Sequence, residues 1–111
     1  MQRIISQTVN DKKIILLQGD VDTCDQRLSR RLQSVQRQGK ECHVWIDCGS
    51  VECIRQLGVC HFINQLLVLR NTNPHIVLVQ PDPVLQQALA VCKVDGLFTC
   101  IPSLEQAYLG V

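Results

Sequence analysis

"CHVWIDCGSVECIRQLGVCHFINQLLVLR", residues 42–70, joins an apolar strand to an apolar helix through a short polar turn. Residues 42–48 are apolar through their centre, which is typical of a buried strand. Residues 57–70 repeat large side chains at helical spacing, and one broad face carries Val59, Phe62, Ile63, Leu66, Leu67 and Leu69. The stretch therefore predicts a buried strand, a turn at 49–58 and a helix that covers a sheet.

The opposite, narrow face of this helix carries Leu57, His61, Asn64, Gln65 and Val68. Leu57 and Val68 are apolar where the helix is expected to meet water, so they predict a small docking patch. The alternative is that they are isolated exposed residues, which are normal on protein surfaces.

Residues 2–9 and 13–19 predict an N-terminal β-hairpin, because the turn residues Asn10 and Asp11 lie between them. The second run has no polar break, as expected of a buried strand. The first strand must run antiparallel to its partner in the hairpin, and we place it at an edge of the sheet.

Residues 22–39 predict the first helix, with Thr23 and Gln26 at the spacing of a capping box and Gly39 closing the end. Its core face carries Leu28, Leu32 and Val35, and its opposite face carries Arg27, Arg30, Arg31 and Arg37. The arginines form a solvated basic face in one interpretation. In the other, they contact an anionic lipid or an acidic partner.

The C-terminal half continues the alternation, with a strand at 75–79, a helix at 81–93, a strand at 97–101 and a helix at 103–109. Asp82 followed by Pro83 predicts one helix start, and Ser103 predicts the other. Strands that alternate with helices imply right-handed crossovers and a largely parallel sheet. We therefore expect an α/β fold with about five strands and about four helices.

The 111 residues are 46% hydrophobic and 19% charged, which fits one globular domain over residues 1–111. The formal net charge of +1 argues against a dedicated nucleic-acid binder. No signal peptide is visible, and the longest apolar run, about residues 57–69, is too short to span a bilayer.

Seven cysteines are many for a chain that we expect in the cytoplasm: Cys24, Cys42, Cys48, Cys53, Cys60, Cys92 and Cys100. No pair has the C-x-x-C spacing, so we expect no metal site. We predict buried, reduced thiols that act as small hydrophobic residues. A redox-sensing thiol is the alternative.

No catalytic arrangement is visible, and we expect neither an enzyme nor a cofactor. Cys60 and His61 are adjacent on a helix and point about 100° apart, with Cys60 expected nearer the buried side. His43 and Cys48 lie on opposite faces of one strand. Four carboxylates could gather near the ends of parallel strands and hold a cation or a small ligand: Asp20, Asp22, Asp47 and Glu52. Solvated loop carboxylates are the alternative.

The order of motifs resembles the STAS domain, the fold of bacterial anti-sigma factor antagonists. The family motif "GELD" is matched by residues 19–22, and "DLSGV" is matched by residues 47–51. "HIVLVQPDPVLQQAL" and "GLFTCIPSLEQA" follow in the family order, so the resemblance covers about the whole chain. It implies a non-catalytic module for protein–protein interaction in signalling and regulation of transcription.

The chain departs from the family at the switch turn, which usually reads "I-D-S-x-G-L". Ile54 and Gly58 keep the frame, but Arg55 replaces the Asp and Gln56 replaces the phosphorylated Ser or Thr. Gln56 cannot receive a phosphoryl group, so we predict that this turn is not phosphorylated. Lys93 stands where the family often has Gly, at a position that can need a left-handed backbone.

We therefore predict docking of a protein partner through Asp20, Asp22, Thr23, Ser50, Glu52, Arg55, Gln56, Leu57, Gly58, Val59, His61 and Val68. The candidate partners are an anti-sigma factor or related kinase, another STAS protein, and a second copy of the chain. Two alternatives stay open: a small STAS subunit that braces a lipid or anion transporter, and a domain that senses a small ligand.

Overall fold

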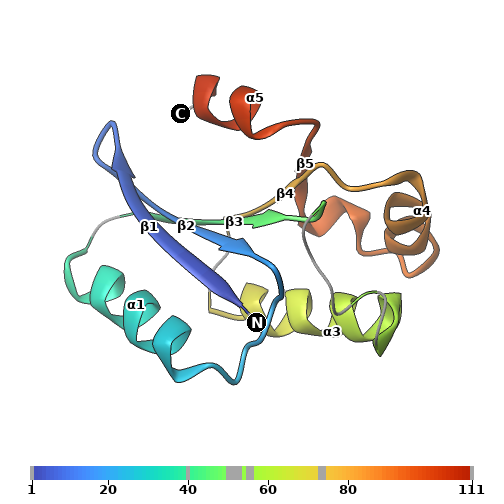
Figure 1. Cartoon of the computed structure of the whole chain (residues 1–111), viewed down its shortest axis with the longest axis horizontal. Helices are drawn as coiled ribbons and strands as arrows, with labels where there is room; N and C mark the ends of the chain where they lie inside the picture. Colours follow the sequence, from blue (N-terminus) through green and yellow to red (C-terminus); the bar gives the residue numbers. More distant parts are fainter. Residues whose placement is uncertain (1, 40, 50–53, 55–56, 73–74, 111) are drawn as a thin grey trace.

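The computed structural model describes residues 2–39, 41–49, 54, 57–72 and 75–110 (Figure 1). In chain order, their elements are β1 (Arg3–Val9), β2 (Lys12–Gln18), α1 (Gln26–Arg37), β3 (Cys42–Asp47), α3 (Val59–Arg70), β4 (Ile76–Val79), α4 (Pro83–Val91), η1 (Asp95–Leu97), β5 (Thr99–Ile101) and α5 (Leu104–Leu109). No helix in these ranges is long and apolar enough to cross a membrane.

The strands form one sheet in the order β1-β2-β3-β4-β5. β1 pairs antiparallel with β2, and the pairs β2–β3, β3–β4 and β4–β5 are parallel. Asn10 and Asp11 adopt φ values of 50° and 65° between the paired residues Val9 and Lys12, which is the conformation of a tight hairpin turn. The predicted mixed sheet, with an N-terminal hairpin and β1 at an edge, is confirmed.

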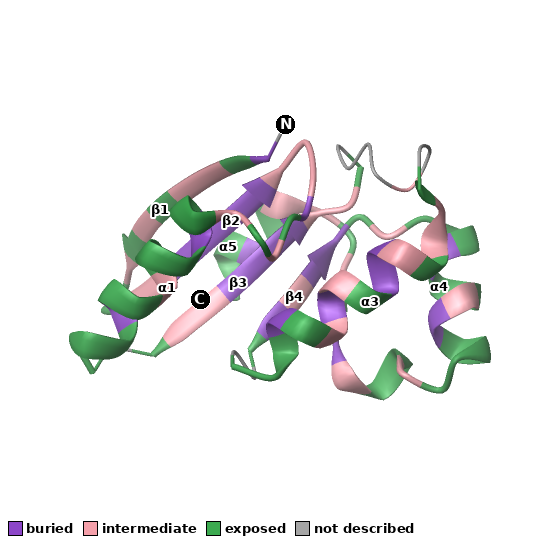
Figure 2. Cartoon of the chain, turned by 90° about the horizontal axis from the view of Figure 1, so that it is seen from below, coloured by how far each residue is buried: buried purple, intermediate pink, exposed green. Residues whose placement is uncertain are grey.

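One face of the sheet is covered by α1, α3 and α4, and this side holds the larger core (Figures 1 and 2). The strands contribute alternate residues to it, such as Ile15 and Leu17 from β2 and Val44 and Ile46 from β3. The three helices contribute Leu28, Val35, Phe62, Ile63, Leu66, Leu69, Leu85 and Leu89. The predicted core faces of α1 and α3 are therefore confirmed, and α4 adds a core face that the sequence analysis did not specify.

The other face of the sheet is covered by α5, which lies on the opposite side from α1 and α3 (Figure 1). Ala107 of α5 packs with Ile14, Leu16 and Trp45. The Tyr108 ring meets Trp45 edge to face, with ring centroids 5.0 Å apart. Because both faces are covered, four consecutive residues of β2 are buried, as its unbroken apolar run predicts.

The helix starts confirm two of the three predicted caps. Asp82 accepts a hydrogen bond from Leu85 N at 2.7 Å, and Ser103 accepts one from Gln106 N at 3.2 Å. The capping box at Thr23 is wrong. Asp25 caps α1 by accepting from Arg27 N at 2.9 Å, because the Thr23 side chain is engaged with α3 instead. The guanidinium of Arg27 also holds the pKa of Asp25 well below its usual range.

α3 begins at Val59, two residues later than predicted. Gly58 precedes it with a φ of 89°, a left-handed conformation that interrupts the helical backbone and suits a residue without a Cβ.

The predicted burial of the cysteines is largely wrong. Cys24, Cys60, Cys92 and Cys100 are exposed, Cys42 and Cys48 are half-buried, and all six are free thiols. Cys60 lies on the outer side of α3, and Cys100 lies on the short edge strand β5, which has one strand neighbour. Burial raises the pKa of the Cys48 thiol to about 12, which keeps it protonated and unreactive. Cys53 is outside the described residues.

Two arginines of the predicted basic face bond to the protein itself. Arg27 Nη2 donates to Gln2 O at 3.1 Å, and Arg31 Nη1 donates to Ile4 O at 3.2 Å. Ile4 belongs to β1 at the edge of the sheet and Gln2 directly precedes it, and an unpaired edge strand can recruit another chain. The arginines therefore protect part of the β1 edge.

Lys93 follows the last turn of α4 with a φ of 59°, so its predicted left-handed backbone is confirmed. We expect Lys93→Gly to stabilise the protein by about 1 kcal/mol, because glycine adopts this conformation without the steric cost that a Cβ carries. Chemical denaturation measures the gain, and Lys93→Ala is the control because it removes the charge but keeps the Cβ. Equal stability of the two variants would contradict this explanation.

His43 and His75 stack at the start of β3 and β4, with ring centroids 4.9 Å apart. The Nε2 atoms of His43 and His75 lie 3.3 and 3.4 Å from Glu41 Oε1. The buried His43 Nε2 has no hydrogen-bond partner among the described residues. Burial lowers the pKa of His43, and this effect exceeds the opposing attraction of Glu41.

The lowered pKa of His43 predicts a loss of stability in acid. Below about pH 6.5, the unfolded chain binds the proton more readily than the folded chain. The free energy of unfolding should therefore fall as the pH drops from 6.5 through the lower pKa of the folded state. His43→Gln should flatten this decline in denaturation curves measured across that range, whereas His61→Gln should not. A decline that is as steep in His43→Gln as in the unsubstituted protein would contradict the assignment.

Candidate functional site

The loop that follows β2 is held firmly beside α3. Gly19 turns the chain with a φ of 79°, and Val21 is buried against the core. Thr23 donates two hydrogen bonds to Gln65 Oε1, from its amide at 3.0 Å and from its hydroxyl at 2.7 Å. Gln65 belongs to the narrow face of α3, so this pair of bonds connects the loop directly to that face.

The N-terminus of the chain supports the same loop through Gln2, whose side chain is buried. Gln2 Oε1 accepts from Asp22 N at 2.9 Å, and Gln2 Nε2 donates to Asp22 O and to Asp25 Oδ2, both at 3.2 Å. Asp22 Oδ1 in turn accepts from Cys24 N at 2.9 Å. The backbone of Asp22 is therefore held by Gln2, and its carboxylate is held by the amide of Cys24.

A cleft of about 290 Å³ lies between this loop and the start of α3, and it is lined by Asp20, Val21, Asp22, Cys24, Leu57, His61 and Gln65. The structure thus brings together four of the predicted site residues: Asp20, Asp22, Leu57 and His61. Leu57 is 62% exposed, so a large apolar side chain stands at the mouth of a cleft that also carries two carboxylates.

The other predicted site residues that the structure describes do not line this cleft. The hydroxyl of Thr23 is hydrogen-bonded to Gln65, and Val59 is half-buried and packs against the main core. Gly58 supplies the turn before α3. Val68 is 51% exposed two helical turns beyond His61, outside the cleft. The predictions for Ser50, Glu52, Arg55 and Gln56 lie outside the described residues.

The predicted exposure of Leu57 and Val68 is confirmed, but further large apolar side chains are exposed that we did not predict. On α4, Val84 is 66% and Val91 is 74% exposed, and Leu109 at the end of α5 is 79% exposed. Their spacing resembles that of core residues, so a single sequence carries no signal that sets them apart.

The described residues show no arrangement for catalysis or for a metal. Cys24 and His61 line the same cleft, but no hydrogen bond joins them, as a thiol and its base would require. Within these residues, no group of three or more His, Cys, Asp or Glu side chains could hold a metal ion. Asp47 does not line the cleft with Asp20 and Asp22. It accepts from Gln18 Nε2 at 3.2 Å.

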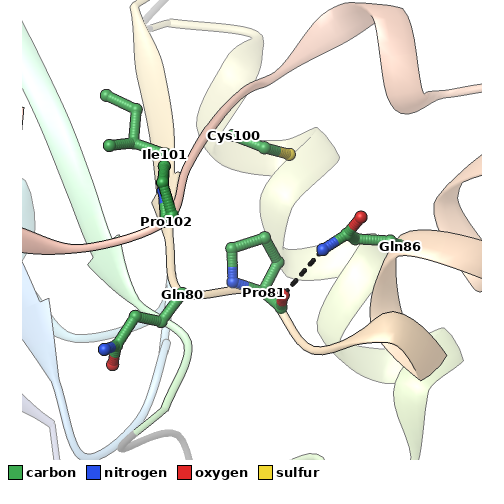
Figure 3. Close-up of a pocket in the computed structure, with 6 residues that line it drawn as sticks. All are labelled: Gln80, Pro81, Gln86, Cys100, Ile101 and Pro102. Atoms are coloured by element: carbon green, nitrogen blue, oxygen red, sulfur yellow. Dashed lines mark hydrogen bonds between the residues drawn. The ribbon is translucent and has the colours of Figure 1, made fainter. Parts of the chain in front are cut away.

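A second hollow, of about 450 Å³, lies where β4 and β5 end, and sequence reasoning missed it (Figure 3). It is lined by Gln80, Pro81, Gln86, Cys100, Ile101 and Pro102. Gln86 Nε2 donates to Pro81 O at 2.8 Å across it. Among the described residues its lining carries no charged side chain.

The fold and the sequence agree with one known family. A family model of the STAS domain matches residues 3–107. The NMR structure of the protein TM1081 has a similar fold, with a TM-score of 0.56 and 15% identity over 96% of this chain and 86% of that chain. A search of curated proteins found no match. STAS domains are generally non-catalytic modules that interact with other proteins. Because the family model spans nearly the whole chain, the chain belongs to the STAS domain family.

Proposed function

We propose that this STAS domain docks a protein partner through one surface, the α3 docking surface, formed by Asp20, Asp22, Leu57, His61 and Val68. The observation that carries the proposal is the pair of hydrogen bonds from Thr23 to Gln65 Oε1, at 3.0 and 2.7 Å. These bonds hold the acidic loop against the exposed side of α3. A surface that is rigid before binding loses little conformational entropy when a partner binds.

The composition of the α3 docking surface indicates the chemistry of the partner. Leu57 and Val68 offer exposed apolar contacts, and Asp20 and Asp22 provide negative charge beside Leu57. A partner that presents an apolar side chain next to Arg or Lys would match both features. By sequence, Ser50, Glu52, Arg55 and Gln56 lead into this surface, and we propose that they extend it.

We further propose that binding is not controlled by phosphorylation of the turn before α3. Gln56 stands at the phosphoacceptor position of the family, and its amide cannot receive a phosphoryl group. Control would then come from the partner, which we place among anti-sigma factors and related kinases, other STAS proteins and larger signalling assemblies. A role in regulating transcription belongs to this proposal.

The two alternative functions have weaker support. A subunit that braces a membrane transporter would use the arginine face of α1. Arg27 bonds to Gln2 and Arg31 bonds to β1, so Arg30 and Arg37 are the members of that face without such a bond to the described part of the N-terminal segment. A ligand-sensing domain would use the cleft beside α3. Its volume of about 290 Å³ lies at the lower limit of small-molecule pockets.

Substitution of the exposed apolar residues tests the α3 docking surface. A partner is first isolated with the native protein, and its affinity is then measured for the variants Leu57→Glu and Val68→Glu. We expect binding at least about tenfold weaker, because each variant places a carboxylate in an apolar contact. Val84→Glu is the matched control, since Val84 is at least as exposed as Leu57 and Val68 but lies on α4. The proposed surface would be contradicted if all three variants weakened the affinity for the partner equally, or if none of them weakened it.

The loss of the phosphorylation switch is tested on the native protein by phosphopeptide mass spectrometry. We expect no stoichiometric phosphate on Ser50 or Thr23, the hydroxyls that remain near the turn. The Thr23 hydroxyl is engaged with Gln65 Oε1 at 2.7 Å, which leaves it poorly available to a kinase. Stoichiometric phosphate on Ser50 would show that the switch has moved by a few residues and is still present.

A further inference from the structure

A crevice between the N-terminal hairpin and α1 gathers positive charge, apart from the α3 docking surface. Its volume is about 130 Å³, and its polar lining comprises Ser6, Gln7, Lys13, Arg31, Ser34 and Gln38. The other lining residues are apolar, and among the described residues the crevice has two cations, two hydroxyl groups and the amide of Gln38 but no carboxylate. The amide of Gln7 bonds to the Tyr108 hydroxyl on the α5 side of the sheet and is not available to the crevice. This balance favours a small anion.

Arg31 is held in place within the crevice. Its Nη1 atom donates to Ser6 Oγ at 2.8 Å and to Ile4 O at 3.2 Å. A guanidinium has five N–H donors, so the Nη2 and Nε edge stays available in a fixed orientation. A planar pair of donors of this kind matches two oxygens of a phosphate group.

Lys13 supplies the second charge from β2. Alternation along the strand places Lys13 on the same side of the sheet as Ile15 and α1, whereas Lys12 lines the opposite side with Trp45. Lys13 makes no side-chain hydrogen bond or ion pair with the described residues, so its ammonium group can meet a ligand. Ser34 of α1 and Gln38, the residue that caps the end of α1, lie about one turn apart and complete the donors. The carbonyl groups at the C-terminal end of α1 carry a partial negative charge that repels an anion. This partial charge is smaller than the two full positive charges of Arg31 and Lys13.

We propose that this crevice is a binding site for a phosphate monoester or orthophosphate group. Arg31 would bind two of the oxygens through its free edge, Lys13 would neutralise charge, and the hydroxyl groups of Ser6 and Ser34 would donate to the remaining oxygens. The phosphate can come from inorganic phosphate in solution or from the monoester headgroup of a lipid. The site does not depend on the α3 docking surface, and each can fail without the other.

The test titrates the full chain with inorganic phosphate at constant ionic strength, with chloride as the reference, and follows backbone amide signals by NMR. The variants Arg31→Gln and Lys13→Gln each remove one charge from the crevice. The matched controls Arg30→Gln and Lys12→Gln each remove one charge next to it. In parallel, vesicles of phosphatidylcholine with and without phosphatidic acid are tested for binding of all five proteins.

We expect saturable shifts at Ser6, Lys13 and Ser34, with affinity at least about tenfold weaker in the two crevice variants and kept in both controls. Vesicle binding without phosphate binding, but with the same pattern of variants, would also support the site and identify the lipid headgroup as its ligand. Equal loss in all four variants, or no binding of phosphate and of phosphatidic acid, would overturn the proposal. If Arg31→Gln disturbs the hairpin, the test depends on the affinities of Lys13→Gln and Lys12→Gln for phosphate. A weaker affinity in Lys13→Gln alone supports the site, and equal affinities overturn it.

Discussion

The burial of β2 on both faces is the constraint on which the rest of the structure depends. Four consecutive residues, Ile14 to Leu17, are buried, and they point alternately to the two sides of the sheet. Each side must therefore be covered, by α1, α3 and α4 on one face and by α5 on the other. A shift of one residue in the pairing would exchange the two faces of the strand, so the apolar pattern also sets the register.

This arrangement places the loop after β2 at the start of α3. β2 and β3 are parallel neighbours, so the chain leaves both at the same edge of the sheet. The loop at that edge is then held by Gln2 on one side and by Gln65 on the other. Both bonds are made by side chains and not by the backbone pairing of the strands and helices, yet together they set where Asp20 and Asp22 stand relative to Leu57. The candidate site is thus a consequence of sheet topology, made rigid by two glutamine side chains.

Much of the fold could be predicted because its signals are local. The hairpin, the core faces of α1 and α3 and the caps at Asp82 and Ser103 all depend on neighbours within a few residues. The left-handed position of Lys93 was also predicted, since the family often has glycine there.

The errors arose where a residue has two possible partners or where burial depends on distant elements. Thr23 has the spacing of a cap, but Gln65, far away in the sequence, competes for its hydroxyl, and Asp25 is available to cap α1 instead. The exposure of Cys60 and Cys100 likewise follows from which faces other elements leave uncovered. The bonds of Arg27 to Gln2 and of Arg31 to β1 join residues about 25 positions apart, so no local pattern in the sequence reports them.

Amide hydrogen exchange of the chain, alone and bound to its isolated partner, tests the central claim most directly. If the partner docks on the α3 docking surface, binding should slow exchange at residues 20–24 and 57–68 and leave the exposed side of α4 and the hairpin turn unchanged. Protection confined to α4, to α5 or to the β1 edge, with α3 unaffected, would contradict the account.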